Sequence, residues 1–291
     1  MFDTAWVALL GAEIRTVGNR YRGRCLVAGD GPPLILLHGQ GGHLENFSRN
    51  VTELAQTHTV YAPDCVWHGL GPQPPFEPAL IPTYVDQVLD LIESERLPRV
   101  SVLGQSMGGW TAARLAVDYE SLVDRLILVN PQGIHLRARS TEPEILPAPG
   151  PAVRAKHLPA LTDPSVATMR DRVLGLVADP TRIDDEVIQI RLNLYRRPEV
   201  NASLQRVMEA YMGGSSAPVY DHRVTEQQLH SISQRTLLIW GEKNMISPQA
   251  GRRISELIPQ SELHVIADTG HWAHYEAPDE HNKIVAQFLA S

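Results

Sequence analysis

The sequence predicts an α/β fold with a mostly parallel, doubly wound sheet and a helical insertion between two late strands. Short apolar runs alternate with amphipathic stretches up to Pro131, which is typical of strand–helix–strand units. This rhythm stops after Pro131 and resumes at Thr236. The residues in between have helical spacing and few β-type runs, so we expect them to interrupt the sheet without extending it.

The expected strands are short apolar runs bounded by turn residues. Residues 34–37 read Leu-Ile-Leu-Leu without a break, as a strand that is buried on both faces does. The strand before it, at 21–27, ends in the turn-forming stretch 28–33, which is rich in glycine and proline. Further strands are expected at 59–62, 100–103, 126–129, 236–240 and 263–266.

The expected helices fall into two groups, those between the strands and those within the insertion. The first group comprises 85–95, 110–119 and the final helix 278–289. The insertion opens with a proline-rich stretch at 143–151 and continues with helices at 165–177 and 184–197. A loop of this length without secondary structure would be unusual in a compact protein, which favours a cap domain. The core is therefore expected over residues 1–132 and 232–291, and the helical cap over 133–231.

Composition excludes several classes of partner. The 291 residues carry a formal net charge of -7, and no basic run is longer than two residues, as at Arg196-Arg197, so we expect no nucleic acid. No apolar stretch approaches the ~20 residues of a membrane span. The N-terminus lacks a basic region followed by an apolar run, so no signal peptide is expected. Cys25 and Cys65 have no metal-ligand spacing, which favours two reduced thiols in a cytoplasmic protein.

No cofactor or metal is implied by the motifs. There is no HExxH or other zinc pattern, and the histidines are scattered. No G-x-G-x-x-G follows a strand in the position that a dinucleotide site requires. The expected partner is therefore a small-molecule substrate.

The most informative motif is Gly-Gln-Ser-Met-Gly at 104–108. It follows an apolar strand and precedes an amphipathic helix, the context in which G-x-S-x-G places its serine on a sharp, exposed turn. Gly104 and Gly108 lack Cβ atoms, so strand and helix can approach closely. The helix N-terminus adds partial positive charge beside the developing anion. We therefore predict that Ser106 is a nucleophile.

A glycine-rich loop, His-Gly-Gln-Gly-Gly at 38–42, follows the buried strand 34–37. Such a loop can aim a backbone N–H at an oxyanion, and the second N–H belongs to the residue after the nucleophile. We assign these two donors to Gln40 and Met107. His38 is expected to be a packed residue that holds the loop.

A general base should follow the nucleophile in the chain. The C-terminal region offers His271 and His274, in a loop between the strand 263–266 and the final helix. The preceding Gly270 favours His271. Imidazole suits this role because its unperturbed pKa lies near 6.5.

Together these motifs resemble the α/β-hydrolase superfamily along almost the whole chain. Within the superfamily the sequence is most similar to the meta-cleavage product hydrolases, which cleave a carbon–carbon bond in vinylogous diketones formed by ring cleavage of catechols. The stretch 41–50, Arg191 and Trp272 carry this closer resemblance.

The resemblance implies that cap and loop residues bind the substrate. Arg191, on the cap helix 184–197, is expected to contact a carboxylate or dienol end, which suits the bidentate guanidinium. Trp272, Gly41 and Gln105 are expected to line the pocket, and Gln105 stands where the family often has asparagine. A homodimer is also implied.

One position departs from the family pattern. Asn244 stands where the fold normally has the aspartate of the triad, and the alternative acid position is also an asparagine, Asn130. The amide oxygen of Asn244 can orient His271, but it cannot stabilise an imidazolium by charge. Glu242 and Asp268 are the remaining candidates for this role, if either reaches the ring.

Three functions follow from this departure. The protein is a C–C bond hydrolase with a Ser-His-Asn arrangement, a carboxylesterase or related acyl hydrolase with the same residues, or a non-catalytic member that binds a ligand. A haloalkane dehalogenase or an epoxide hydrolase would have aspartate at position 106, so both are disfavoured.

Overall fold

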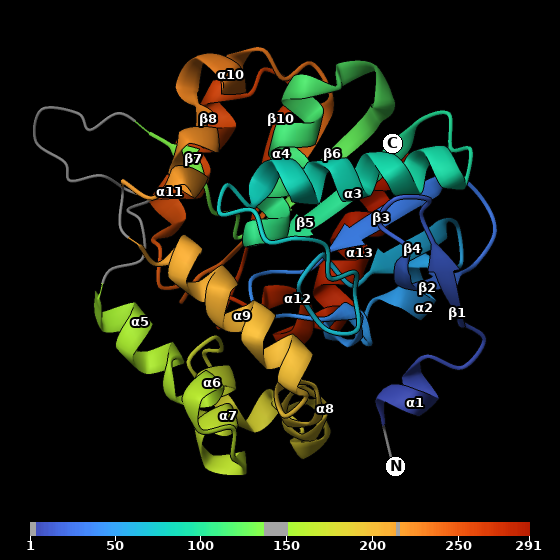
Figure 1. Cartoon of the computed structure of the whole chain (residues 1–291). Coiled ribbons are helices and arrows are strands. Elements are labelled where there is room, and N and C mark those ends of the chain that lie inside the picture. Colours follow the sequence, from blue (N-terminus) through green and yellow to red (C-terminus); the bar gives the residue numbers. More distant parts are fainter. Residues whose placement is uncertain (1–3, 137–150, 214–215) are drawn as a thin grey trace, which may run out of the picture.

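The computed structural model describes residues 4–136, 151–213 and 216–291. At its centre lies an eight-stranded sheet in the order β1-β2-β4-β3-β5-β6-β9-β10 (Figure 1). All neighbouring strands pair in parallel except β2, which is antiparallel to both β1 and β4. The strands are β1 Glu13–Val17, β2 Gly23–Ala28, β3 Pro33–Leu37, β4 Thr59–Pro63, β5 Val100–Gln105, β6 Val123–Val129, β9 Arg235–Gly241 and β10 Ser261–Ile266.

The sequence prediction of a mostly parallel α/β sheet is confirmed. The expected strands all occur, with ends that differ by up to three residues. The edge strand β1 was not predicted, because four of its five residues are exposed and its sequence lacks a buried apolar run. It extends the sheet through antiparallel pairing with β2.

Helices cover both faces of the sheet. One apolar cluster joins the sheet to α3, α4 and α11, and a second cluster on the opposite face joins it to α2 and α13. The final helix, α13, was predicted at 278–289 and ends at residue 290 in the structure. Helix α3 was predicted at 85–95 and begins four residues earlier. The bounds are α1 Ala5–Ala8, α2 Val51–Leu54, α3 Ile81–Ser94, α4 Met107–Asp118, α10 Glu226–His230, α11 Pro248–Leu257, α12 Ala273–Glu276 and α13 Pro278–Ala290.

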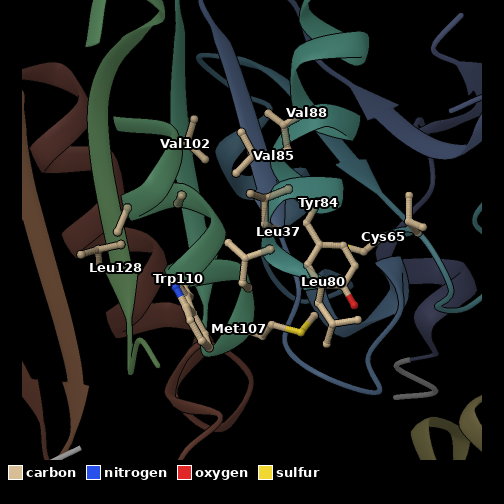
Figure 2. Packing of buried hydrophobic residues seen from close by; sticks show 14 of the residues in the cluster. Leu37, Cys65, Leu80, Tyr84, Val85, Val88, Val102, Met107, Trp110 and Leu128 are labelled. Carbon is tan, nitrogen blue, oxygen red and sulfur yellow. The ribbon is translucent and has the colours of Figure 1, made fainter. Parts of the chain in front are cut away.

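The first cluster fixes the helix that follows the nucleophile motif. Figure 2 shows Met107 and Trp110 of α4 packed among apolar side chains of the sheet and of α3. Both side chains are buried, and the indole of Trp110 donates a hydrogen bond of 2.9 Å to the carbonyl of His222. The N-terminus of α4 is therefore held firmly at the carboxyl edge of the sheet.

The chain between β6 and β9 forms the helices of the cap region (Figure 1). Two short strands, β7 and β8, pair in parallel near its two ends, which the sequence did not predict. The predicted proline-rich stretch lies outside the described residues except for Pro151. The limits 133 and 231 stay a prediction. The elements are β7 Ile134–His135, α5 Pro151–His157, α6 Pro159–Thr162, α7 Val166–Leu174, α8 Asp185–Tyr195, α9 Pro198–Tyr211 and β8 Val224–Thr225.

Two other structural observations bear on the sequence predictions. Cys25 and Cys65 are both buried and free, as expected for reduced thiols. In the three described ranges, every helix is too short or too polar to pass through a membrane.

Candidate active site

Ser106 is the single residue between β5 and α4. Its backbone has φ 56° and ψ −115°, a left-handed conformation that costs a non-glycine residue about 1–3 kcal/mol. Backbone hydrogen bonds hold the turn. The N–H of Ser106 donates to the carbonyl of Val129, and the carbonyl of Ser106 accepts from the N–H groups of Trp110 and Gln132. A Cβ on Gly108 would collide with the carbonyl of Leu37. The strained turn therefore requires the motif's small residues.

His271 lies in the loop after β10 and lines the same pocket as Ser106. Its ring Nδ1 is 3.0 Å from Asn244 Oδ1, so the amide oxygen accepts the Nδ1 proton. This tautomer leaves the Nε2 lone pair available as a base. The loop is anchored by His271 N–H, which donates to the carbonyl of Leu176 in the cap at 2.7 Å.

The other acid candidates do not contact the imidazole. Glu242 accepts a hydrogen bond from the backbone N–H of Asp268, and the carboxylate of Asp268 pairs with Lys243 at the surface. Asn130 binds backbone instead: its Nδ2 donates to the carbonyl of His271 at 3.1 Å, and its Oδ1 accepts from Gly241. Asn130 therefore positions the histidine loop, a role that sequence reasoning missed.

Burial lowers the pKa of His271 to about 4. A charged carboxylate would oppose this effect by stabilising the imidazolium, but the neutral Asn244 supplies no such charge. The described residues that line the pocket include no aspartate or glutamate. His271 is thus neutral near pH 7, the form that accepts a proton.

The loop after β3 carries the predicted oxyanion donor. Its turn is closed by a 3.0 Å hydrogen bond from Gly42 N–H to the carbonyl of Gly39. Within the described part of the chain, the backbone N–H groups of Gln40 and Met107 donate no hydrogen bond, so both remain available to an oxyanion. His38 is buried and bonds to the loop, with a pKa lowered by burial to about 3.

Arg191 of α8 reaches the pocket from the cap. Its side chain is buried, and Nη2 donates to Asn46 Oδ1 at 3.2 Å. Its guanidinium lies 4.8 Å from the ring centroid of Trp272, a cation–π geometry. Arg191 and Trp272 are therefore brought together, and Asn46, which sequence reasoning did not single out, joins them.

Two further predicted residues differ in their placement. Gln105 lines the pocket and donates to the carbonyl of His271 at 3.2 Å. Gly41 is not among the described lining residues, because Arg172 and the hydroxyl of Tyr195 cover it. Its expected role in substrate binding stays a prediction. The pocket is lined by Gly39, Gln40, Asn46, Gln105, Ser106, Gln132, Val153, His157, Arg172, Leu176, Arg191, Tyr211, Met212, Met245, His271 and Trp272.

His274, the competing base, lies outside this lining. Its ring is buried and packs on Phe47 and His281, with centroids 5.3 and 6.1 Å away. Arg172 and His157 are pocket residues that sequence reasoning missed. A single arginine or histidine on an amphipathic helix gives no signal of its own, because most such residues face solvent.

A family model described as alpha/beta hydrolase fold matches residues 32–278, and the chain belongs to this family. A 2-hydroxy-6-oxononadienedioate/2-hydroxy-6-oxononatrienedioate hydrolase of a Pseudomonas species is 31% identical over 210 residues, which are 71% of this chain and 69% of that protein. The 2-hydroxymuconate semialdehyde hydrolase of Pseudomonas putida is 27% identical over 285 residues, or 97% and 94% of the two chains.

A solved structure extends the likeness to the fold. The 2-hydroxy-6-oxo-6-phenylhexa-2,4-dienoate hydrolase from Rhodococcus sp. strain RHA1 has a TM-score of 0.82 and 24% identity, and the match covers 96% of this chain and 100% of that one. The predicted α/β-hydrolase fold is confirmed. The relatives also confirm that the chain is a hydrolase similar to the meta-cleavage product hydrolases.

Proposed function

We propose that the protein is a serine-dependent hydrolase that cleaves a carbon–carbon bond next to a ketone in a vinylogous diketone bearing a carboxylate. One observation carries the proposal: a single pocket holds Ser106 and His271 together with the buried guanidinium of Arg191. The first pair suits attack on a carbonyl, and the guanidinium suits a carboxylate or dienolate. The named substrates of two relatives, hydroxy-oxo-dienoates and a hydroxymuconate semialdehyde, support the same class.

The residues define a sequence of steps. His271 Nε2 takes the proton of Ser106 as the serine oxygen attacks the ketone, and the N–H groups of Gln40 and Met107 hold the oxyanion. The carbon–carbon bond then breaks, and its electron pair is delocalised into the vinylogous carbonyl while His271 returns the proton to carbon. Water, activated by the same imidazole, releases the acyl group from Ser106.

The absence of a triad carboxylate is more compatible with cleavage of this carbon–carbon bond than with hydrolysis of an amide. Replacement of the triad aspartate by asparagine costs about 10⁴-fold in kcat in a serine protease, where the leaving group is a poor one. A ketonised vinylogous substrate leaves as a stabilised carbanion, so it demands less of the base. Arg191 adds a positive charge at the substrate end where negative charge collects.

Spectrophotometry of a yellow dienolate substrate tests the proposal. The wild-type protein should bleach the colour, and Ser106→Ala should abolish turnover while it still binds the substrate. Turnover of p-nitrophenyl esters without any bleaching would favour a carboxylesterase instead. Unchanged turnover in Ser106→Ala would contradict the serine mechanism.

A further inference from the structure

The loop that carries the predicted oxyanion donor is held by side chains of two cap helices. The hydroxyl of Tyr195, on α8, donates a hydrogen bond of 3.0 Å to the carbonyl of Gly41. Arg172, on α7, donates from Nη2 to Gln40 Oε1 at 3.1 Å. Both cap side chains are 2% exposed. These contacts join the cap to the loop beside the N–H group that is to hold the oxyanion.

The backbone of this loop has few restraints of its own. Three of the five residues at 38–42 are glycines, which have the widest choice of backbone conformation. Gly41 has φ 70°, a region that glycine adopts without strain. A Cβ at this position would collide with the hydroxyl of Tyr195 and with the guanidinium of Arg172. The missing side chain therefore admits the two cap groups, and the cap supplies a restraint that the loop lacks.

Two planar peptide groups connect the hydroxyl of Tyr195 to the oxyanion donor. The carbonyl of Gly41 and the N–H of Gly42 belong to one peptide group, so a bond to the carbonyl also orients the N–H. The N–H of Gly42 donates to the carbonyl of Gly39 at 3.0 Å. That carbonyl shares its peptide group with the N–H of Gln40. Tyr195 thus acts on the direction of the Gln40 N–H, and hydrogen-bonded amides in a chain also polarise one another.

The other end of this turn is held by the core. His38 Nε2 accepts from the N–H of Cys65 at 3.0 Å, so Nδ1 carries the proton and donates to the carbonyl of Gly39 at 2.9 Å. A Cβ on Gly39 would lie 3.0 Å from the Cβ of Ser106, so this part of the loop lies directly against the nucleophile. The turn is therefore fixed by His38 on the core side and by Tyr195 on the cap side.

We propose that Tyr195 is a positioning residue for the oxyanion hole: its hydroxyl holds the carbonyl of Gly41 so that the N–H of Gln40 points at the developing oxyanion. The oxyanion role of Gln40 rests on the proposed function. Tyr195 is not among the described residues that line the pocket, so it acts through the loop and not on the substrate. Its loss should therefore slow the chemical step without weakening substrate binding.

Steady-state kinetics of Tyr195→Phe test the proposal, because this change removes only the hydroxyl. Loss of a whole oxyanion donor costs about 10²–10³-fold in kcat, so loss of its support should cost less, about tenfold, with KM unchanged. The substrates are a yellow dienolate and p-nitrophenyl butyrate. The rate at which a fluorophosphonate labels Ser106 gives the same comparison without turnover, since attack on phosphorus places an anionic oxygen in the same hole.

Tyr220→Phe is the matched control. The hydroxyl of Tyr220 also donates to a backbone carbonyl of the cap region, that of Tyr211, at 2.6 Å. Both variants lose one buried hydrogen bond, so both should lower the Tm by a similar amount. Only Tyr195→Phe should lower kcat and slow the labelling.

Three results would overturn the positioning role. They are a wild-type kcat in Tyr195→Phe, a raised KM with unchanged kcat, and an equal loss of kcat in Tyr220→Phe. If the dienolate is still bleached, each of them leaves the proposed function intact. A tenfold loss with the ester or the fluorophosphonate, in a protein that bleaches no dienolate, would contradict the proposed function alone. A wild-type protein that neither reacts with the fluorophosphonate nor turns over either substrate would overturn both.

Discussion

The two ends of the pocket differ in charge. At the core end, Ser106, His271 and Asn244 are neutral, and burial keeps the imidazole unprotonated. At the cap end, Arg172 and Arg191 place two positive charges in a buried setting. In a protease-like triad the fixed charge is an anion behind the base. Here the fixed charges line the pocket, and under the proposed function the substrate supplies the negative charge that the site lacks.

The largest expected effect comes from the neutral end. His271→Ala should lower kcat by about 10⁴-fold or more, because the base for both the attack and the release of the acyl group is lost. Stopped-flow or steady-state absorbance with a dienolate measures this. His274→Ala, three residues further along on α12, is the matched control for removal of a buried histidine. A larger loss of kcat in the control would contradict the assignment.

At the charged end the effect should be smaller and of a different kind. Arg191→Gln should reduce kcat/KM by about 10- to 100-fold, the range of a lost charge-assisted contact. Arg196→Gln, at the exposed end of the same helix, should leave kcat/KM unchanged. Steady-state kinetics on both variants measure the difference. Equal kcat/KM values for Arg191→Gln and the wild type would contradict a role for this positive charge in turnover.

Restoring the missing anion would make the neutral end resemble a protease. Asn244→Asp should raise kcat by about tenfold, because a carboxylate at 3.0 Å from the ring stabilises the imidazolium. It should also raise the pKa of His271, so the acidic limb of the pH–rate profile moves to higher pH. The profile of Asn244→Ala, which removes the hydrogen bond without adding charge, serves as the comparison. An unmoved acidic limb in Asn244→Asp would show that residue 244 does not act on the base.

Glu276 links the two ends of the pocket, and its replacement should change kcat several-fold. Glu276 is buried, and its carboxylate accepts from Gly270 N–H at 2.6 Å and from Ala178 N–H in the cap at 2.8 Å. Glu276→Gln should lower kcat and stability, by about 1–3 kcal/mol for the latter, while the exposed Glu280→Gln changes neither. Thermal melts and kinetics together measure this. A variant with lower Tm but unchanged kcat would make Glu276 purely structural.

Mild acid should have a small effect on turnover and a larger effect on the stability of the fold. Burial lowers the pKa of His38 and His68 to about 3 and that of His281 to about 4. The unfolded chain binds protons at these sites from about pH 6.5 downward, so stability falls as the pH drops below that value. Each such histidine costs up to about 2 kcal/mol at pH 5. Melts from pH 7 to pH 5 should show a falling Tm, and a constant Tm would contradict these shifts.

The sequence predicts the fold well because its signals are local. Residues 34–37 and 126–129 are continuous apolar runs that only a doubly buried strand explains, and both occur in the structure. The turn at Ser106 was predictable because its conformation requires glycines at fixed offsets. The edge strand β1 carries no such signal, since its side chains are mostly exposed.

The site was predictable only where chain position determines contact. Asn244 was placed near His271 by its position after a parallel strand, and the structure brings its amide oxygen within hydrogen-bond distance of the imidazole. Arg172 and Asn130 could not be found in this way. Arg172 depends on how α7 packs over the loop at Gln40, and the bond from Asn130 to the histidine backbone depends on loop geometry. Both arise from tertiary packing.

The carbonyl of Leu176 accepts hydrogen bonds from the backbone N–H groups of both His271 and Trp272. A movement that lifts this part of the cap away would break both bonds, while Asn130, Gln105 and Asn244 would still hold His271 to the core. The position of the imidazole therefore depends on the seating of the cap as well as on the sheet.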